Sequence, residues 1–344
     1  MMKNNKKKIL FIASLNTKKD RYDGERIKST LMYDSLKKLF SVDVINLSVH
    51  KIFNTFRIIL VGLFSRKKYD SLVVSKDPHG ANIIIKLLRL TKYPLDKIIY
   101  FEIGPFLYDR IINGSIKKEN FKDIKIIVET NSMKAELESL GVRVFNIFPN
   151  FKSKFDVPFL EQKYPKKTLK LVFFSRIDEM KGIYDLMEAV SQINKERVRF
   201  TLDIFGLISI NYDEKRFKDL LSSNKEIRYF GKLNLVESKD YSLLSKYDLH
   251  VFPTKYSEGF PGTLIDFFIA GVPTLSSNFA RAYDILSDSN SFFFERGSVD
   301  DLKRMLLYIY DNQEELIQKR VESFKMRDNY TTDKFEEYCK NIII

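Results

Sequence analysis

Short apolar runs alternate with longer segments of helical spacing along the first half of the chain. The apolar runs have the length of buried strands, and the segments between them gather apolar residues on one face of a helix. Strands are therefore expected at Ile9–Ala13, Val42–Leu47, Ser71–Ser75, Ile98–Glu102, Lys125–Val128 and Val144–Phe148, and helices at Arg26–Leu39, Ala81–Leu90 and Ser132–Leu140. This alternation is typical of a doubly wound parallel sheet.

The polar stretch Asn150–Lys167, which contains Pro158 and Pro165, interrupts the alternation and indicates a linker. The pattern then restarts, with strands expected at Leu169–Phe174, Arg199–Phe205, Ile227–Phe230, Leu249–Phe252 and Thr274–Ser276, and helices at Ile183–Ile193, Val299–Tyr310 and Thr332–Ile344. The sequence therefore predicts an α/β protein of two domains that face a cleft. The expected divisions are a first domain at 1–150, a linker at 151–168, a second domain at 169–325, and a C-terminal helix at 326–344 that packs back toward the first domain.

The segment from Ser257 to Pro273 carries the clearest candidate chemistry, because a glycine-rich turn and a helix start lie between two carboxylates, Glu258 and Asp266. Helical spacing of the apolar residues predicts a helix that begins near Pro261 or Gly262. The first backbone N–H groups of that helix have no intrahelical partner, and together with the helix dipole they form a potential anion site. The amides concerned are those of Gly262, Thr263 and Leu264. Carboxylates on either side of such a turn suit the hydroxyl groups that flank a diphosphate in a nucleotide sugar.

Two cations follow the first strand of the second domain. Arg176 comes directly after the buried run that ends at Phe174, and Lys181 precedes the next expected helix. Both should lie above the sheet edge, where they can neutralise a diphosphate or remain solvated loop charges. Glycines also follow the next two strands, Gly206 and the Gly231-Lys232 pair, at points where backbone can approach a ligand closely.

The chain of 344 residues carries a net charge of +13, for which nucleic acid, an anionic membrane and anionic small substrates are all possible partners, and a basic solvated surface without a partner is the alternative. The basic residues are scattered and form no zinc-finger or RNP-type signature, so specific nucleic-acid recognition is not expected. No G-x-G-x-x-G opens the first helix, which counts against a dinucleotide-dependent oxidoreductase. The single cysteine, Cys339, fits a reducing cytoplasm, and no metal motif is apparent.

One apolar stretch, Ile52–Phe64, ends in the basic run Arg66-Lys67-Lys68. It is too short to span a bilayer, and Arg57 interrupts it. Two alternatives are open: a buried helix of the first domain, or an interfacial helix with a cationic rim on an anionic membrane.

The order of these elements in the second half resembles that of the retaining GT-B glycosyltransferases of family four, the glycosyl transferases group 1. The resemblance covers residues 169 to about 300 and depends on Ser175-Arg176, Lys181-Gly182, Gly206, Phe230-Gly231 and the pattern from Glu258 to Pro273. It implies a GT-B fold of two Rossmann-like domains. It also implies that Arg176 and Lys181 bind the donor diphosphate, that Glu258 contacts the donor sugar, and that Asp266 holds the nucleotide ribose, where the family has Glu. Further donor contacts are expected from Gly24, Gly206, Lys232, Gly259, Phe260, Pro261, Gly262, Thr263 and Leu264.

The first domain matches the family more loosely. Members often carry a Gly-Gly loop after the first strand, where this chain has Asp23-Gly24, and a histidine near the acceptor, which the stretch from Phe101 to Phe106 lacks. Glu102 and His79 are the candidate acceptor-side residues, although each also suits an incidental strand-end or loop position.

Together with the resemblance, these observations predict a metal-independent hexosyltransferase without a cofactor, and the resemblance implies that the transfer retains the anomeric configuration. The expected substrates are a nucleoside-diphosphate sugar and a glycan or lipid-linked acceptor in the biosynthesis of a surface polysaccharide such as capsule or lipopolysaccharide. The expected location is cytoplasmic, with peripheral contact to the inner face of the membrane. A sugar-nucleotide-binding protein without turnover is the main alternative, and a dinucleotide-dependent oxidoreductase ranks below it.

Overall fold

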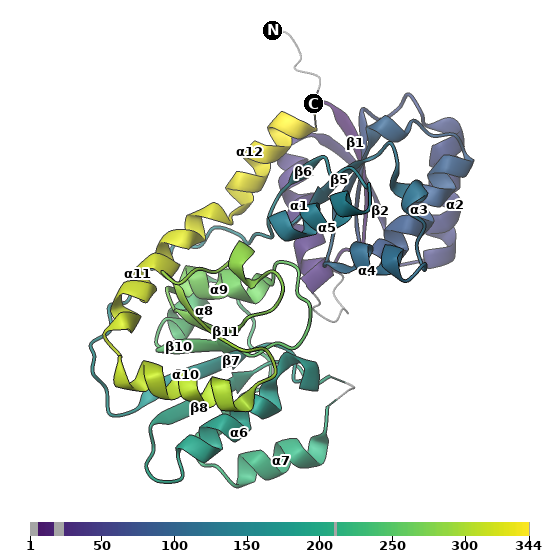
Figure 1. Ribbon diagram of the computed structural model, residues 1–344. Coiled ribbons are helices and arrows are strands. Elements are labelled where there is room, and N and C mark those ends of the chain that lie inside the picture. Colours follow the sequence, from purple (N-terminus) through teal and green to yellow (C-terminus); the bar gives the residue numbers. More distant parts are fainter. Residues whose placement is uncertain (1–5, 17–23, 210–211, 344) are drawn as a thin grey trace. The chain divides into compact units, whose positions relative to one another are not determined.

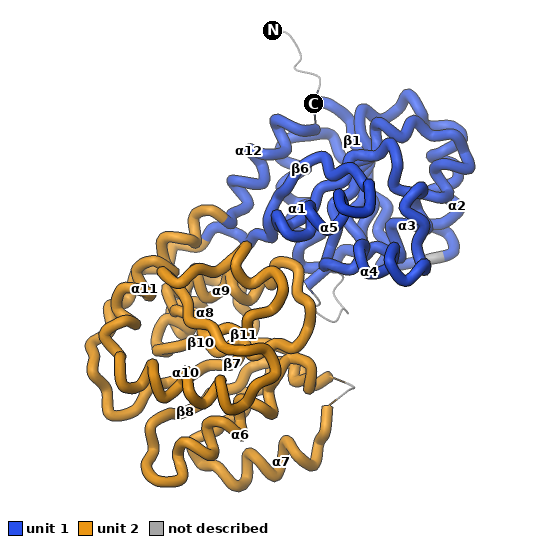
Figure 2. The backbone as a smooth tube through the Cα atoms, viewed as in Figure 1, with its two compact units in different colours: residues 1–154, 330–344 blue, residues 155–329 orange. Residues whose placement is uncertain are grey.

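The computed structural model describes residues 6–16, 24–209 and 212–343 of the protein (Figure 1). The chain divides into two compact units, residues 1–154 with 330–344 and residues 155–329 (Figure 2). Each unit is built on a six-stranded sheet in which neighbouring strands run parallel, so the predicted α/β class with two doubly wound sheets is confirmed.

The sheet of unit 1 has the strand order β2-β1-β3-β4-β5-β6. Its strands are β1 (Lys8–Ala13), β2 (Ser41–Asn46), β3 (Ser71–Lys76), β4 (Ile98–Glu102), β5 (Lys125–Val128) and β6 (Asn146–Ile147). Its helices are α1 (Gly24–Leu39), α2 (Lys51–Phe64), α3 (Pro78–Leu90), α4 (Phe106–Ile112), α5 (Asn131–Ser139) and α12 (Thr332–Ile342), with short 3₁₀ turns at Leu95–Lys97 and Lys118–Phe121. Helices α2, α3, α4 and α5 contribute to the core on one face of the sheet, and α1 and α12 to the core on the other.

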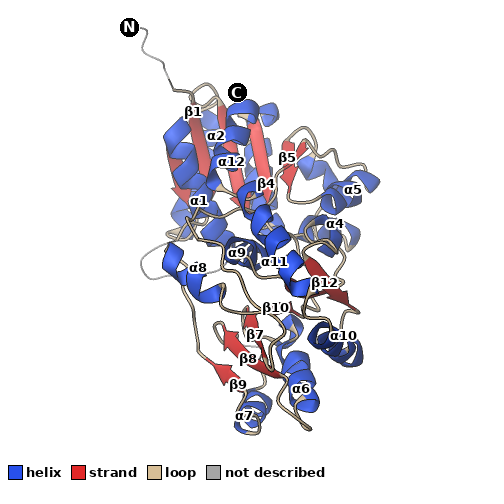
Figure 3. Ribbon diagram, turned by 90° about the vertical axis from the view of Figure 1, so that its left-hand side faces the viewer, coloured by secondary structure: helices blue, strands red, loops and turns tan. Residues whose placement is uncertain are grey.

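The last helix, α12, belongs to unit 1 although residues 155–329 precede it (Figure 3). Its Phe335 is fully buried and stacks on Phe151, with ring centroids 4.5 Å apart. Lys38 of α1 and Glu336 of α12 form an ion pair with an N–O distance of 2.6 Å. The C-terminal helix therefore completes the α1 face of the first sheet.

The sheet of unit 2 has the strand order β12-β11-β10-β7-β8-β9. Its strands are β7 (Leu169–Phe174), β8 (Phe200–Phe205), β9 (Ile227–Tyr229), β10 (Leu249–Phe252), β11 (Thr274–Ser277) and β12 (Ser291–Phe294). Its helices are α6 (Ile183–Ile193), α7 (Glu214–Ser222), α8 (Ser238–Leu244), α9 (Gly262–Ala270), α10 (Val299–Asp311) and α11 (Glu315–Met326), with 3₁₀ turns at Glu179–Lys181, Ala282–Asp284 and Arg327–Asn329. The order of the strands reverses between β7 and β10. In open parallel sheets such a switch point, at the carboxyl ends of the strands, is where ligands bind.

Helix α2 bears on both alternatives for the apolar stretch 52–64. Only one side of the helix is buried, at Asn54 and Ile58, whereas Phe56 is 61% and Phe64 is 79% exposed. The alternative of a buried helix therefore describes one side of α2, and the other side is exposed. Among the residues that the structure describes, no helix is long and apolar enough to cross a membrane.

Candidate functional site

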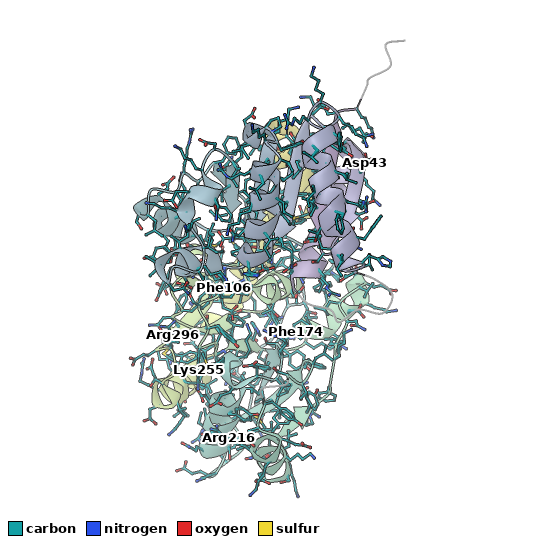
Figure 4. The ribbon with its side chains drawn as sticks, turned by 90° about the vertical axis from the view of Figure 1, so that its right-hand side faces the viewer. Asp43, Phe106, Phe174, Arg216, Lys255 and Arg296 are labelled. Atoms are coloured by element: carbon teal, nitrogen blue, oxygen red, sulfur yellow. The ribbon has the colours of Figure 1, made fainter. Side chains whose placement is uncertain are left out.

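The loops that follow β7 and β10 meet at the switch point of the second sheet. The two strands pair directly, with Leu171 opposite Leu249. Beyond the strands, Gly182 approaches the other loop so closely that a Cβ atom on it would lie 1.9 Å from the carbonyl oxygen of Pro253. Gly182 also has a φ of 73°, which L side chains rarely adopt. Figure 4 labels Phe174, at the end of β7, and Lys255, in the loop after β10.

Helix α9 begins at Gly262, as the sequence predicts, and Pro261 is its N-cap. The hydroxyl of Thr263 donates a 2.8 Å hydrogen bond to the carbonyl of Phe174, so the helix start is fixed to the end of β7. The expectation of three unpaired amides needs a correction, because the N–H of Leu264 donates to the carbonyl of Pro261 at 3.1 Å. No side chain of the described residues caps this helix, so the positive end of its dipole lies at the switch point.

Lys181 and Glu258, 77 residues apart in sequence, form an ion pair at this edge of the sheet. The Lys181 Nζ lies 2.5 Å from Glu258 Oε1, and the two side chains are 12% and 15% exposed. The same carboxylate oxygen accepts a 2.7 Å hydrogen bond from Thr254 Oγ1. The Lys181 ammonium also lies 5.1 Å from the ring centroid of Tyr256, within the range of a cation–π contact. A cation and a carboxylate are thus held together beside the start of α9.

Arg281, which the sequence analysis did not consider, supports the same loop. Its guanidinium donates to Ser257 Oγ at 2.8 Å and to the backbone carbonyl of Glu258 at 3.3 Å, and the residue is only 3% exposed. Arg281 follows β11, which pairs with β10 in parallel. A cation soon after the strand next to β10 is therefore the sequence signal that could have revealed it.

Backbone and side-chain contacts join the β7 loop to the β10 loop. The N–H of Lys255 donates to the carbonyl of Met180 at 2.8 Å, and its ammonium lies 2.8 Å from a carboxylate oxygen of Asp185. On the β7 side, Asp178 accepts a 2.9 Å hydrogen bond from the N–H of Met180 and caps the turn that carries Lys181. These contacts fix the backbone on both sides of the Lys181–Glu258 pair.

The remaining predicted residues of the β7, β8 and β9 loops differ in exposure and packing. Arg176 is exposed, as is Lys232 in the loop after β9. At Gly206 a Cβ atom would lie 1.7 Å from the carbonyl oxygen of Ser175, and its N–H donates to the carbonyl of Gly231 at 2.8 Å. The close packing of neighbouring loops is therefore sufficient to explain the glycine at 206.

Asp266 is turned toward α8. Its residue is 3% exposed, and Oδ1 accepts a 3.0 Å hydrogen bond from the hydroxyl of Tyr241. Burial, together with the neighbouring Asp266 carboxylate, raises the pKa of Tyr241 far above its usual value, so the phenol remains protonated and donates. Gly259 and Phe260, between the two carboxylates, are also buried. The structure therefore holds Glu258 and Asp266 in different surroundings.

The other predicted site residues belong to unit 1. Gly24 is exposed and begins α1, while Asp23 lies outside the described residues. His79 is exposed in the first turn of α3, where its backbone N–H donates to Asp77. Glu102 is 2% exposed at the end of β4, and its carboxylate accepts a 2.9 Å hydrogen bond from the N–H of Leu107. Its visible role is to fix the start of α4.

The fold, with two doubly wound parallel sheets and charged loops at the switch point of the second, is that of the GT-B glycosyltransferases. Residues 154–325 match the family of glycosyl transferases group 1, and the chain belongs to this family. The chain also resembles solved structures over nearly its whole length. HepE of Anabaena, in complex with UDP and glucose, is 12% identical with a TM-score of 0.69, and the match covers 97% of this chain and 98% of HepE.

Two further structures show the same fold. Sucrose-phosphate synthase of Thermosynechococcus elongatus is 11% identical with a TM-score of 0.74, over 98% of each chain. The lipopolysaccharide outer core galactosyltransferase WaaB is 14% identical with a TM-score of 0.67, over 97% of this chain and 99% of WaaB. No curated protein matches the chain by sequence. In the described part of the chain, no group of three or more His, Cys, Asp and Glu side chains is arranged to hold a metal ion.

Proposed function

We propose that this glycosyltransferase moves a sugar from a nucleoside-diphosphate sugar to a hydroxyl group of a glycan or lipid-linked acceptor, with retention of anomeric configuration. The observation that carries the proposal is the Lys181–Glu258 ion pair beside the start of α9, at the switch point of the second sheet. Structures of similar fold also support it, because HepE was solved with UDP-glucose and the pneumococcal O-GlcNAc transferase GtfA with UDP and GlcNAc.

In the proposed reaction, the bond between the sugar and the diphosphate breaks through an oxocarbenium-like transition state, and negative charge grows on the departing diphosphate. Arg176, Lys181 and the N-terminal end of α9 stabilise that charge. Cations and backbone donors that are held in place before the reaction lower the barrier without having to reorganise. The diphosphate competes with Glu258 for Lys181, and the Glu258 carboxylate thereby becomes available to accept hydrogen bonds from the hydroxyl groups of the donor sugar.

Asp266 is the proposed ribose contact. Its carboxylate is one methylene shorter than the Glu that the family has at this position, and it is buried against Tyr241. In the proposal it reaches the ribose hydroxyls through a small shift of the α9 backbone or through a bridging water. The proposed acceptor is a growing surface polysaccharide or a lipid-linked glycan. Incubation of the protein with a labelled donor and extracted lipids would identify it by the product that takes up the label.

The proposal also assigns the neutralisation of the diphosphate to protein groups rather than to a metal ion. Transfer should therefore proceed at the same rate with and without a chelator of divalent cations. A rate that falls with the chelator and is restored by added Mg²⁺ would overturn this part of the proposal and leave the sugar transfer itself standing.

The test of the function begins with thermal unfolding of the full chain in a panel of nucleotide sugars, UDP-sugars first. A ligand at 100 times its Kd should stabilise the protein by about 2.7 kcal/mol. Release of nucleoside diphosphate from the donor that binds would exclude a binding protein without turnover. Absence of both a thermal shift and release across the panel would refute the function.

The site assignment has its own test. Lys181→Ala should lower the rate of transfer by about 100-fold or more, as loss of one preorganised donor does in other enzymes. The matched control is Lys218→Ala. Lys218 also belongs to unit 2, and its ammonium forms an ion pair of the same length, 2.5 Å, with Glu214 on the exposed side of α7. Equal activity of the Lys181 and Lys218 variants would contradict the assignment.

A further inference from the structure

The outward side of α2 is covered by large apolar side chains. Those exposed by 46% or more are Ile52, Phe53, Phe56, Leu60, Leu63 and Phe64. At about 100° per residue they occupy an arc of about 120° around the helix, opposite the arc that contains the buried Asn54 and Ile58. Single exposed apolar side chains are ordinary on protein surfaces, but a contiguous set on one helix marks a surface that contacts something else.

Helix α3 packs beside α2 and extends this surface. Figure 4 shows unit 1 from the side on which both helices lie in Figure 1. On α3, Ile83 is 47% and Leu90 is 80% exposed, and the exposed Lys86 lies between them on the same stripe of the helix. We call these exposed side chains of α2 and α3, with the exposed basic residues of the loops that follow the two helices, the α2–α3 face. The basic loop residues are Arg66, Lys67, Lys68 and Lys92.

The segment of the chain that contains this face carries much of its positive charge. Residues 44–95 contain nine Lys and Arg against two Asp, a balance of +7 within the +13 of the whole chain. Neither α2 nor α3 contains an acidic residue. One of the two aspartates, Asp77, is paired with Lys76 at 2.9 Å, and Asp43, just before this segment, lies 3.1 Å from the ammonium of Lys68. An apolar helix surface with a basic rim has the composition of a segment that lies in the plane of an anionic membrane.

The charge also separates the possible occupants of the face. A second copy would bring an equal positive charge against it, and like charges across an interface oppose association. A bilayer that contains anionic lipids attracts the basic rim and accepts the apolar side chains between its headgroups. Helix α2 has 14 residues and is therefore about 21 Å long, which suits a position along the membrane surface and falls short of the ~30 Å of its apolar core.

We propose that the α2–α3 face docks on the surface of an anionic lipid bilayer, with α2 lying in the headgroup region. The inference does not depend on the proposed sugar transfer, since binding to the bilayer requires neither donor nor acceptor. It would bring unit 1 to the surface at which lipid-linked molecules are found.

The chain contains no tryptophan, so a single introduced one reports its own surroundings. In Phe56→Trp, on α2, the fluorescence should shift to shorter wavelength on addition of phosphatidylcholine vesicles with about one third phosphatidylglycerol. The control is Ile317→Trp, at a position on α11 that is 49% exposed, whose emission should not change. Equal shifts in both variants, or none in Phe56→Trp, would overturn the proposal.

Co-sedimentation of the full chain with the same vesicles measures separately what the basic residues and the apolar side chains contribute to binding. Lys67→Glu with Lys86→Glu should weaken binding by more than 10-fold, because each basic residue near an anionic surface contributes about fivefold. Lys195→Glu with Lys225→Glu changes the net charge equally in unit 2 and serves as the control. Leu60→Ser with Leu63→Ser should also weaken binding by more than 10-fold, and Val198→Ser with Ile317→Ser, at similar exposure, should bind as the wild type does.

If both test pairs sediment with the vesicles as the wild type does, the proposal is wrong. It is equally wrong if the wild type forms dimers without vesicles and Leu60→Ser with Leu63→Ser abolishes them, because the face then belongs to a second copy. Binding of the wild type to pure phosphatidylcholine as strong as to the anionic vesicles would remove the role assigned to the basic rim and overturn the proposal as stated.

Discussion

The contact between Gly182 and Pro253 is the point at which the fold of unit 2 and its candidate site can be tested together. Gly182→Ala introduces a Cβ that would lie 1.9 Å from the Pro253 carbonyl oxygen, where real Cβ atoms essentially never come closer than 3.0 Å. The contacting group is backbone, so no side chain can rotate away. The two loops must separate by 1.1 Å or more, the difference between these two distances.

The expected cost has two parts. A non-glycine residue at a positive φ costs about 1–2 kcal/mol, and an overpacked contact costs about 1–3 kcal/mol more. Gly297→Ala isolates the first part, because Gly297 has a similar φ of 80° and no heavy atom within 4 Å of its added Cβ. Gly182→Ala should therefore be less stable than Gly297→Ala by about 1–3 kcal/mol.

The measurement is urea denaturation and thermal unfolding of both variants and the wild type, as the full chain. A difference of about 2 kcal/mol corresponds to roughly 4–8 °C in the melting temperature of a unit of this size. Separation of the loops also moves Lys181, the neighbour of Gly182, away from Glu258. Because a misplacement of about 1 Å can lower catalysis about 100-fold, Gly182→Ala should also lose transfer activity at temperatures where it is folded. Equal stability of the two variants would refute the contact, and full activity of a destabilised Gly182→Ala would refute its link to the site.

Three further predictions concern carboxylates. Burial would raise the pKa of Asp77, but the hydrogen bond from Lys76 outweighs it and lowers the pKa below its ordinary value. The wild type therefore has a stabilisation at neutral pH that it loses in acid, as the pH falls through the pKa of the folded state. Asp77→Asn should keep the cap of α3 and lack this stabilisation, which acid denaturation measures. Lys28 and Glu129 form a 2.5 Å ion pair in which each side chain is 4% exposed. Lys28→Met leaves the buried Glu129 carboxylate without this partner and should lower the free energy of unfolding by about 3–5 kcal/mol in urea denaturation, whereas Lys28→Met with Glu129→Met should recover most of that loss. An unchanged urea midpoint in Lys28→Met would contradict this prediction. If Asp266 holds the ribose, Asp266→Asn should lose the thermal shift by the donor and Asp266→Glu should keep part of it, whereas equal shifts in both would assign Asp266 to structure alone.

Hydrophobic pattern predicted most of the strands because they are buried on both faces. Leu249–Phe252 is apolar except for a buried histidine, and the strand has the predicted bounds. The edge strand Ser291–Phe294 was missed, since serines, aspartate and asparagine precede it and it reads as part of a loop. Helix Glu214–Ser222 was missed because Phe217 is its only buried residue, which leaves little apolar periodicity to detect.

The site was predictable as a set of residues but not as a set of contacts. Lys181 and Glu258 could be placed in strand-end loops from the sequence, but their pairing depends on β10 lying next to β7, which the order of the strands along the chain does not reveal. Arg281 required the position of β11 as well. Helical periodicity indicates that Asp266 can face the cleft above the strand ends, but its burial and its contact with Tyr241 depend on the packing of α8 beside α9, which the sequence does not reveal.

The positive residues of the two units differ in how far nearby carboxylates balance their charge. At the switch point of unit 2, Lys181 is balanced by Glu258 and Lys255 by Asp185, so the candidate donor site adds little to the net charge even though it is rich in cations. The excess instead lies in unit 1, which also contains the helix whose outward face is apolar. An anionic small substrate would account for charge at the switch point, whereas contacts to the phosphates of nucleic acid would use the basic groups and leave the apolar helix surface unexplained. An anionic bilayer uses both properties at one surface, which is why excess charge beside an exposed apolar helix favours it as the partner.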